Sequence, residues 1–226
     1  MSKLWQKNYE LDQLVEKCTV GLDYQLDQHL LAADCVASLA HATMLEKIGI
    51  LTTAELTALK KGLVAIIQAS QSGSFPIRQA DEDGHTAIEN YLTAQTGAAG
   101  KKIHTGRSRN DQVIVATRLY ARGFLLAFMK NGLTLVKNLL AFAEEHQWVP
   151  MPGRTHMQIA MPSSVGLWAG AYAEQLLDDL LLVRTAYEIN NQSPLGSAAS
   201  YGVPLPLDRE LVAELLGFAK VQNNVL

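Results

Sequence analysis

The sequence predicts an all-α protein, in which a small helical region near the N-terminus precedes long antiparallel helices. Apolar residues recur every three or four positions through most of the chain, and no window shows sustained strand alternation. One helical pattern also runs unbroken from about Asn110 to about His146. A helix of that length spans on the order of 55 Å at 1.5 Å per residue and is typical of a bundle or an interface.

The first elements follow from apolar spacing and capping residues. Residues 1–25 are polar and predict an extended or short-helical lead, and residues 26–48 then form an amphipathic helix that Gly49 ends. Thr52 and Glu55 have capping-box spacing before a second helix, which ends at the breaker residues 72–76. An acidic turn at 79–84 leads into a short helix, for which Thr86 and Glu89 have capping-box spacing.

The later elements are separated by proline and glycine. The short helix ends at Gly97, and a polar loop leads to the long helix, which is broken at residues 150–152. We expect the connection to be a loop, with a second long helix starting at 162–164 and continuing to about 187. A last short helix covers about 208–216 and ends at Gly217.

Composition limits the classes of function. With 226 residues, 48% of them hydrophobic and 18% charged, the chain is long enough for a sizeable core and is not disordered. A net charge of -3 predicts no nucleic-acid partner. Cys18 and Cys35 make no disulfide framework, the N-terminus lacks the apolar run of a signal peptide, and no stretch has the length and uninterrupted apolarity of a membrane span. We therefore expect a soluble cytoplasmic protein without a membrane partner.

The polar loop before the long helix has the composition of an anion receptor. Lys101, Lys102, Arg107 and Arg109 sit together in a mildly acidic protein, and Ser108 and Asn110 lie between or beside the arginines. A helix start presents free backbone N–H groups and the positive end of its dipole. This pattern predicts a site for a small anion, while the alternative is a capped helix start with a solvated basic loop.

A second polar connection carries Thr155, His156 and Gln158. Antiparallel helices joined by a short turn begin at opposite ends of a bundle, so the two connections should meet only between subunits, which predicts an oligomer. By itself His156, like His85 in the acidic turn, is more often a satisfied loop histidine than a catalytic one. No two histidines have metal-site spacing and no glycine-rich phosphate loop is present, so we expect no metal site.

Together these stretches resemble the argininosuccinate lyase family of the fumarase and aspartase superfamily. The main matches are His104-Thr105-Gly106-Arg107-Ser108-Arg109-Asn110-Asp111-Gln112-Val113 and Pro152-Gly153-Arg154-Thr155-His156-Met157-Gln158. Lesser matches are Glu82-Asp83-Gly84-His85, Ser193-Pro194-Leu195-Gly196-Ser197 and Leu207-Asp208-Arg209-Glu210. The resemblance implies a fumarase/aspartase-like fold, with an N-terminal helical domain at 1–107 and the first part of a central long-helix bundle at 108–226.

The resemblance also implies an activity. Members of this family cleave argininosuccinate reversibly to arginine and fumarate without a cofactor, as homotetramers whose active sites combine loops from three subunits. Carried over by motif position, His156 has the acid–base role, and the remaining positions bind or support substrate: Ser108, Arg109, Asn110, Thr155, Gln158 and His85. Negative charge develops on a carboxylate during such an elimination, and preorganised donors and an imidazole suit that chemistry.

The sequence departs from the family pattern in several places. It stops at Leu226, before the loop that supplies the family's catalytic serine and a substrate-binding lysine, which suggests a truncated chain that is inactive alone. Arg154 stands where an aromatic residue is common, and Gly84 where an aliphatic one is. The usual N-terminal motif is also replaced, so no N-terminal substrate contact is carried over. Two alternatives remain open: a catalytically silent, crystallin-like helical scaffold, and a related lyase that releases fumarate from another substrate.

Overall fold

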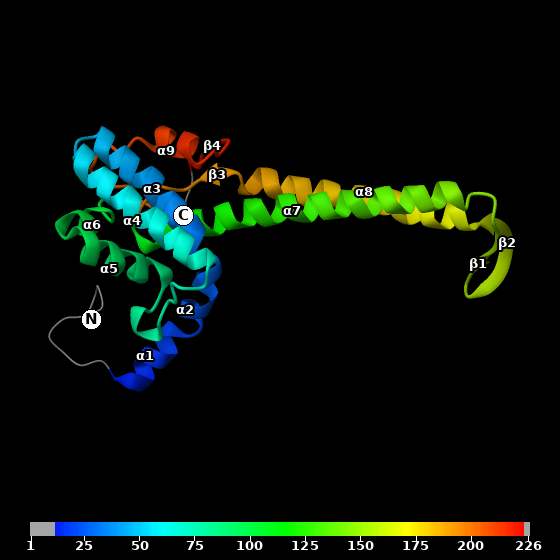
Figure 1. The fold of residues 1–226 in the computed structure, drawn as a ribbon. Helices are drawn as coiled ribbons and strands as arrows, with labels where there is room; N and C mark the ends of the chain where they lie inside the picture. The colour runs from blue at the N-terminus through cyan, green and yellow to red at the C-terminus, as the bar shows by residue number, and fades with distance from the viewer. Residues whose placement is uncertain (1–11, 224–226) are drawn as a thin grey trace. The chain divides into compact units, whose positions relative to one another are not determined.

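The computed structural model of the protein describes residues 12–223 (Figure 1). Contacts divide the chain into two compact units: unit 1 is Met1–Tyr120 with Asn191–Leu226, and unit 2 is Ala121–Asn190. The sequence had suggested a boundary between residues 107 and 108. The compact units divide elsewhere because the first turns of the long helix pack with the N-terminal helices, where Val115 is fully buried in their core. The domain division at 107 stays a prediction.

Unit 1 is mainly helical. Its elements are α1 (Gln13–Val20), α2 (Asp23–Leu26), the 3₁₀ turn η1 (Asp27–His29), α3 (Leu31–Lys47), α4 (Thr53–Gln71), the 3₁₀ turn η2 (Gln79–Asp81), α5 (Gly84–Thr96), α6 (Ala98–Lys102), the start of α7 (Arg109–Glu145), β3 (Gln192–Ser193), α9 (Arg209–Leu215) and β4 (Lys220–Val221). β3 and β4 pair in parallel over two residues each. The helix expected from residue 26 begins at Leu31, because a 3₁₀ turn precedes it.

Local capping chemistry sets several boundaries of these helices. The predicted capping box of α4 is confirmed, since Glu55 N donates to Thr52 Oγ1 at 3.2 Å and Thr52 N donates to a Glu55 carboxylate oxygen at 2.8 Å. The predicted box of α5 is wrong. There Asp83 is the N-cap and accepts from Thr86 N at 2.8 Å, so the helix starts two residues before Thr86. An aspartate at the position before the first turn is a strong N-cap, and it takes precedence over a threonine inside that turn.

The core of unit 1 lies between α3, α4 and α5. Fully buried leucines and isoleucines from these helices form one cluster, which also contains residues from α9 and from the start of α7: Leu31, Leu45, Leu59, Leu63, Ile66, Ile88, Leu92, Val115 and Val212. Small residues allow close approach, and a Cβ at Gly100 would lie 2.4 Å from the backbone nitrogen of Thr93. A core of this density holds the connection between α6 and α7 on a rigid support.

Unit 2 consists of the rest of α7, α8 (Val165–Asn190) and the antiparallel hairpin of β1 (Pro150–Thr155) and β2 (Gln158–Ser164) (Figure 1). The prediction that this connection is a loop is wrong, and so is the start of the second long helix at 162–164, since those residues belong to β2. Prolines face each other in the hairpin at Pro152 and Pro162. Both strands of a two-stranded sheet are edges, where the missing N–H of proline is tolerated. Because most residues of both strands are exposed, the hairpin lacks the alternation that would have revealed it.

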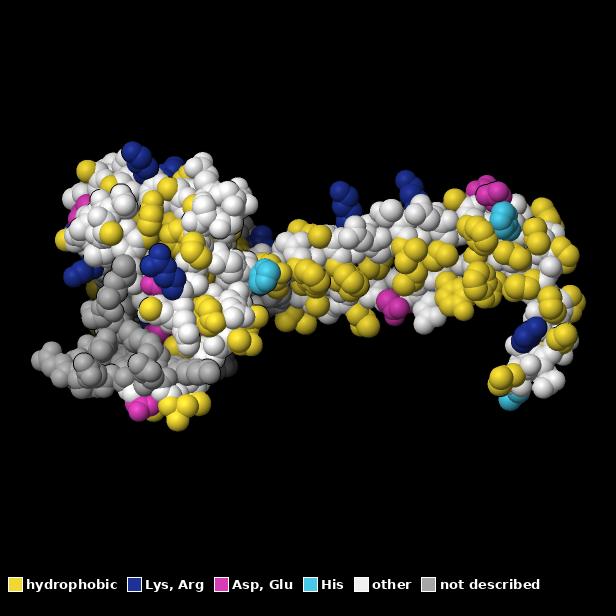
Figure 2. Space-filling view, turned by 60° about the horizontal axis from the view of Figure 1, so that its bottom comes forward, with side chains coloured by type: hydrophobic (Ala, Val, Ile, Leu, Met, Phe, Trp, Pro, Cys, Tyr) yellow, Lys and Arg dark blue, Asp and Glu magenta, His cyan; other side chains and the backbone are white. Residues whose placement is uncertain are grey.

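The two helices of unit 2 pack closely at small residues. A Cβ at Gly132 of α7 would lie 2.7 Å from Leu180 of α8, and a Cβ at Gly166 would lie 2.5 Å from the carbonyl oxygen of Ala143. Many large apolar side chains on both helices remain exposed, as Figure 2 shows along α7 and α8. Within residues 12–223 the two small sheets are the only departures from helices, turns and loops, and the predicted all-α class is confirmed.

The apolar character of α7 corrects one expectation. Arg109–Glu145 is long and apolar enough to cross a membrane by length and composition alone, although the sequence had suggested that no stretch reaches that limit. Only 17% of its most apolar window is buried inside the structure. A single helix of this kind is weak evidence for a membrane span, because helices that bury their apolar faces against other helices pass the same test.

Candidate functional site

The arginine-rich loop ends at the first turn of α7 in unit 1, as predicted. Ser108 Oγ accepts from Asn110 N at 3.3 Å, and Ser108 N donates to a carboxylate oxygen of Asp111 at 2.9 Å. Ser108 is half-buried and Asn110 is exposed. These bonds place the serine and asparagine side chains at the positive end of a 37-residue helix, where an anion is favoured.

The two arginines of the loop have different environments. Arg107 is buried and its Nη1 donates to Ser38 Oγ at 2.9 Å, so this guanidinium belongs to the interior of unit 1. Arg109 keeps 37% of its side chain exposed and lines a cavity of about 400 Å³ with residues of α1, the first residue of α2 and the turn before α5. Of the two arginines in the loop, only Arg109 therefore lines this cavity.

The cavity at Arg109 is lined by side chains of both positive and negative charge. Its lining comprises Val15, Thr19, Val20, Asp23, Glu82, Asp83 and Arg109. Arg109 Nη1 lies 3.3 Å from an Asp83 oxygen, and Nη2 lies 3.7 Å from a Glu82 oxygen and donates to Thr86 Oγ1 at 3.2 Å. A partly exposed guanidinium in a cavity that three carboxylates also line suits a ligand that has both carboxylate and cationic groups.

The acidic turn before α5 contains a strained residue. Glu82 has φ 67° and ψ -54°, a conformation that L residues rarely adopt, and its side chain is largely buried beside Arg109. Such a γ-turn geometry is uncommon and costs of order 1–3 kcal/mol. The surrounding contacts therefore hold Glu82 in place at the edge of the cavity.

His85 is buried in unit 1 and is paired with Asp34 of α3. Its Nδ1 donates to Asp34, whose carboxylate also accepts from Gln112 Nε2 at 2.9 Å and from Ser38 Oγ at 3.2 Å. Burial alone would lower the pKa of His85, but the charges of Asp34, Asp83 and Asp27 and the bond to Asp34 outweigh it, so this pKa lies above its ordinary value. His85 Nε2 is buried and has no hydrogen-bond partner among residues 12–223.

Asp111 connects the arginine-rich loop to the segment that follows β3. Besides accepting from Ser108 N, its carboxylate accepts from Ala198 N at 2.8 Å and from Gly196 N at 3.2 Å. Desolvation by burial raises the pKa of Asp111 despite these bonds and the nearby Arg107. The Ser193–Ser197 motif is thereby fixed against the start of α7.

The second predicted group lies at the tip of the hairpin in unit 2. Thr155 pairs with Gln158, and the two residues between them, His156 and Met157, have φ values of 52° and 66°. Two consecutive positive φ values in a two-residue hairpin loop are the mark of a type I′ turn, which usually contains Asn-Gly. A histidine and a methionine in this turn cost conformational energy, and such strain commonly marks a functional position. All four residues are exposed.

The structure thus brings some predicted residues together and separates others. Ser108, Arg109 and Asn110 share the start of α7, and His85 follows Asp83, which contacts Arg109. Thr155, His156 and Gln158 share the hairpin, which belongs to the other compact unit. Whether the two groups join in one site stays a prediction.

The sequence pattern did not predict several residues that lie around these groups. Thr19, Asp23 and Glu82 line the cavity, but nothing in their spacing links them to Arg109. The signal for Asp34 was present: Asp34, Ser38 and His41 follow at i, i+4 and i+7 on one face of an otherwise apolar helix, and all three are buried. Polar residues at such positions need partners from other segments. Within the part of the chain that the structure describes, no group of three or more His, Cys, Asp and Glu side chains is arranged to hold a metal.

Comparisons with known proteins agree with this fold. Argininosuccinate lyase of Phocaeicola vulgatus is 46% identical over 224 residues, and that of Thermotoga neapolitana is 45% identical over 222 residues. These alignments cover 99% and 98% of this chain but 50% and 56% of the relatives, so the chain spans about half the length of the curated relatives it matches.

Solved structures show the same architecture. EDDS lyase in complex with formate superposes with a TM-score of 0.79 at 27% identity, covering 96% of this chain and 43% of that one. A fumarate lyase:delta crystallin from Brucella melitensis has a TM-score of 0.74 at 19% identity over 96% of this chain and 51% of its own, which supports the fold alone. The family model described as "Lyase" matches residues 7–226. The chain therefore belongs to this lyase family.

Proposed function

We propose that this chain is part of an argininosuccinate lyase, which cleaves argininosuccinate to arginine and fumarate by β-elimination. The observation that carries the proposal is the cavity of about 400 Å³ where Arg109 lies beside Asp23, Glu82 and Asp83. Argininosuccinate has carboxylates, an ammonium group and a guanidinium group, so a site for it needs both signs of charge. The argininosuccinate lyases that are 43–47% identical to nearly the whole chain support this choice of substrate.

The start of α7 suits the carboxylate end of the substrate. Arg109 can form paired hydrogen bonds to a carboxylate, and the hydroxyl of Ser108 and the amide of Asn110 are donors at the same helix start. Charge accumulates on the carboxylate next to the carbon that loses its proton, so donors already in place there lower the barrier. His85 would support the same ligand from the first turn of α5.

The hairpin suits the acid–base step. The exposed imidazole of His156, presented on a strained turn, can exchange a proton with the substrate, and Thr155 and Gln158 flank it as hydrogen-bond donors. We assign proton transfer to His156 and substrate binding to Thr155 and Gln158. In the elimination, a base removes the proton beside the carboxylate, the C–N bond breaks, and the guanidino nitrogen leaves with its electron pair and gains a proton.

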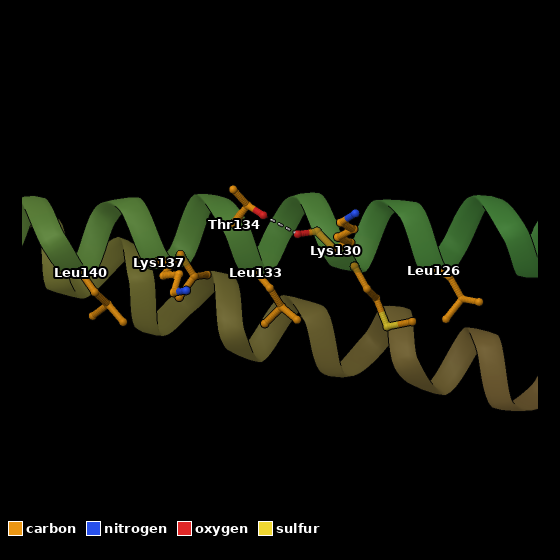
Figure 3. A pocket seen from close by; sticks show the side chains of 8 residues that line it. Leu126, Lys130, Leu133, Thr134, Lys137 and Leu140 are labelled. Carbon is orange, nitrogen blue, oxygen red and sulfur yellow. Dashed lines mark hydrogen bonds between the residues drawn. The ribbon is translucent and has the colours of Figure 1, made fainter.

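The exposed face of unit 2 supports an oligomer that would bring hairpin and helix start together. Leu126, Leu133 and Leu140 recur every seven residues on α7 and point the same way along a groove of about 720 Å³ (Figure 3). Exposed aromatic residues extend this apolar surface, and Phe124 is 59% exposed. We infer that unit 2 packs against other copies of itself in a cytoplasmic homotetramer, and a mass measurement in solution by light scattering tests it.

The test of the activity is fumarate release from argininosuccinate, followed by ultraviolet absorbance. It uses the chain alone and the chain joined to the second half of the Phocaeicola vulgatus relative. We expect activity in the joined protein, with a loss of about 100-fold or more for His156→Asn. Asparagine tolerates positive φ, so the turn should persist. Met157→Asn makes the same change one residue later and is the matched control.

The outcomes separate the alternatives. Folded, oligomeric protein without fumarate release from any substrate would refute the proposal and favour a silent scaffold. Release of fumarate from EDDS but not from argininosuccinate would favour the related lyase, a choice that the structural likeness to EDDS lyase makes concrete. Equal rates for His156→Asn and the control would remove the role of His156.

A further inference from the structure

A buried polar cluster is centred on Asp34 of α3. It includes His85, the residue before Thr86, whose Oγ1 accepts from Arg109. The Asp34 side chain is 3% exposed and that of His85 is 7% exposed, so the pair is shielded from water. The two residues are 51 positions apart in the sequence, which means that the fold itself creates the contact. A buried carboxylate is costly unless every oxygen has partners. Here His85, Gln112 and Ser38 supply them.

These contacts determine which nitrogen of His85 carries hydrogen. A carboxylate only accepts hydrogen bonds, so the contact with Asp34 requires a proton on Nδ1. The other nitrogen, Nε2, is buried without a partner among the described residues. The ring therefore has a hydrogen bond at Nδ1 and none at Nε2, which is the arrangement expected of an imidazole whose free nitrogen binds a ligand.

The charges that surround His85 favour the doubly protonated ring. Asp34 from α3, Asp83 before α5 and Asp27 from η1 act on it and raise its pKa, against the opposing effect of burial. The nearby His104 does not add a positive charge that would oppose protonation of His85. Burial and the charges of Arg107, His85 and Arg109 lower the pKa of His104 to about 4, so its ring is neutral at pH 7. Arg107 acts on Asp34 and, with His85 and Gln112, holds the pKa of Asp34 below its ordinary value against desolvation.

We propose that Asp34 is a positioning residue, which holds His85 as an imidazolium whose Nε2–H donates to a carboxylate of the ligand. The proposal rests on the proposed function, because a dicarboxylate ligand gives the buried Nε2–H an acceptor. It adds a residue that no motif contains. Asp34 itself does not touch the ligand, and it acts through the orientation and charge of His85.

The purely structural alternative has a different consequence. If Asp34 only accepts Nδ1–H of a neutral His85 in the core, the ring of the unmodified protein carries a single proton at pH 7, and a neutral isostere that preserves the hydrogen bond leaves it so. Asp34→Asn is that isostere, since its amide oxygen can still accept from Nδ1 but has no charge. Removal of an opposite charge at hydrogen-bond distance weakens proton binding by about tenfold or more.

The first experiment is a ¹⁵N NMR titration of the chain without ligand, in which His85→Gln assigns the His85 resonances among those of the six histidines. We expect a doubly protonated His85 ring at pH 7 in the unmodified protein. Proton binding should be about tenfold weaker or more in Asp34→Asn. Asp178→Asn, an exposed change of the same charge in unit 2, should have no effect. A neutral ring at pH 7, or unchanged proton binding in Asp34→Asn, would overturn the proposal.

If Asp34→Asn does not fold, the titration of the unmodified chain still tests the proposal, since a neutral His85 ring at pH 7 overturns it without the variant.

The second experiment measures fumarate release against pH in the joined protein. In Asp34→Asn, the alkaline limb of the profile should move to lower pH. A reduced rate with an unmoved profile would indicate a structural role and refute the positioning role. Because the NMR result needs no activity, failure of the lyase assignment and failure of the Asp34 role remain distinguishable.

Discussion

Any side chain at Gly166, in the first turn of α8 after the hairpin, should destabilise the protein. A Cβ at this position would lie 2.5 Å from both the carbonyl oxygen of Ala143 and Cα of Gln147. Both are main-chain atoms, so no side-chain rotation can relieve the contact. Overpacking costs about 1–3 kcal/mol and rigid surroundings place the cost near the upper end, so we expect Gly166→Ala to destabilise this junction by about 3 kcal/mol.

The effect should appear as local opening. Val165 N donates to Val149 O at 3.0 Å and Gly166 N donates to His146 O at 3.2 Å, and these bonds tie the ends of α7 and α8 together below the hairpin. At about 1.4 kcal/mol per factor of ten, a loss of 3 kcal/mol speeds amide exchange about 100-fold in residues 146–166. Hydrogen exchange read by mass spectrometry measures this.

A matched control lies one turn further along α8. No atom lies within 4 Å of a Cβ built at Gly170, so Gly170→Ala should gain about 0.5–1 kcal/mol from helix propensity and slow the exchange. If Gly166→Ala exchanges like the unmodified protein, the close packing described at this junction is wrong. If Gly170→Ala loosens the junction equally, the cost does not come from the contact with α7.

Three further changes probe the strained turn, the buried Arg107 and the buried His41. Met157→Gly removes a left-handed strain and should stabilise the hairpin by about 1 kcal/mol, measured as slower amide exchange at its strands; faster exchange would contradict the turn geometry. Arg107→Met removes the buried guanidinium that acts on Asp34 alongside His85 and donates to Ser38 Oγ, and it should cost about 3–5 kcal/mol in urea unfolding. An unchanged free energy of unfolding would mean that the buried charge of Arg107 adds nothing. Burial, Arg107 and His104 lower the pKa of His41 to about 3, so the unfolded chain binds a proton that the folded one excludes. Stability should therefore fall by up to about 1.4 kcal/mol per unit as pH decreases from about 6.5. His41→Gln, which can still donate to Thr105 O, should flatten the urea-unfolding profile between pH 4.5 and 6.5, and an equally steep profile would exclude His41 as the source.

Local chemistry in the sequence determined the helices and their ends. The capping box of Thr52 and Glu55, the N-cap Asp208 and the left-handed Gly97 act within a few residues, so each could be recognised without the fold. Apolar spacing determined the length of α7 in the same way, and the start of this helix at Arg109 followed. The polar loop at that start, with Ser108, Arg109 and Asn110, could be selected because its composition does not suit a core.

Tertiary structure decided the features that depend on distant partners. The hairpin of unit 2 forms through pairing between exposed strands that have no apolar alternation, so its pattern is absent from the sequence. Arg107 is buried in unit 1, where it donates to Ser38, 69 residues away in the sequence. Arg109 lies at the cavity, where it pairs with Asp83, 26 residues away. Asp34 meets His85 for the same reason. Contacts between segments so far apart follow from how the helices pack, and neither residue carries a local sign of its partner.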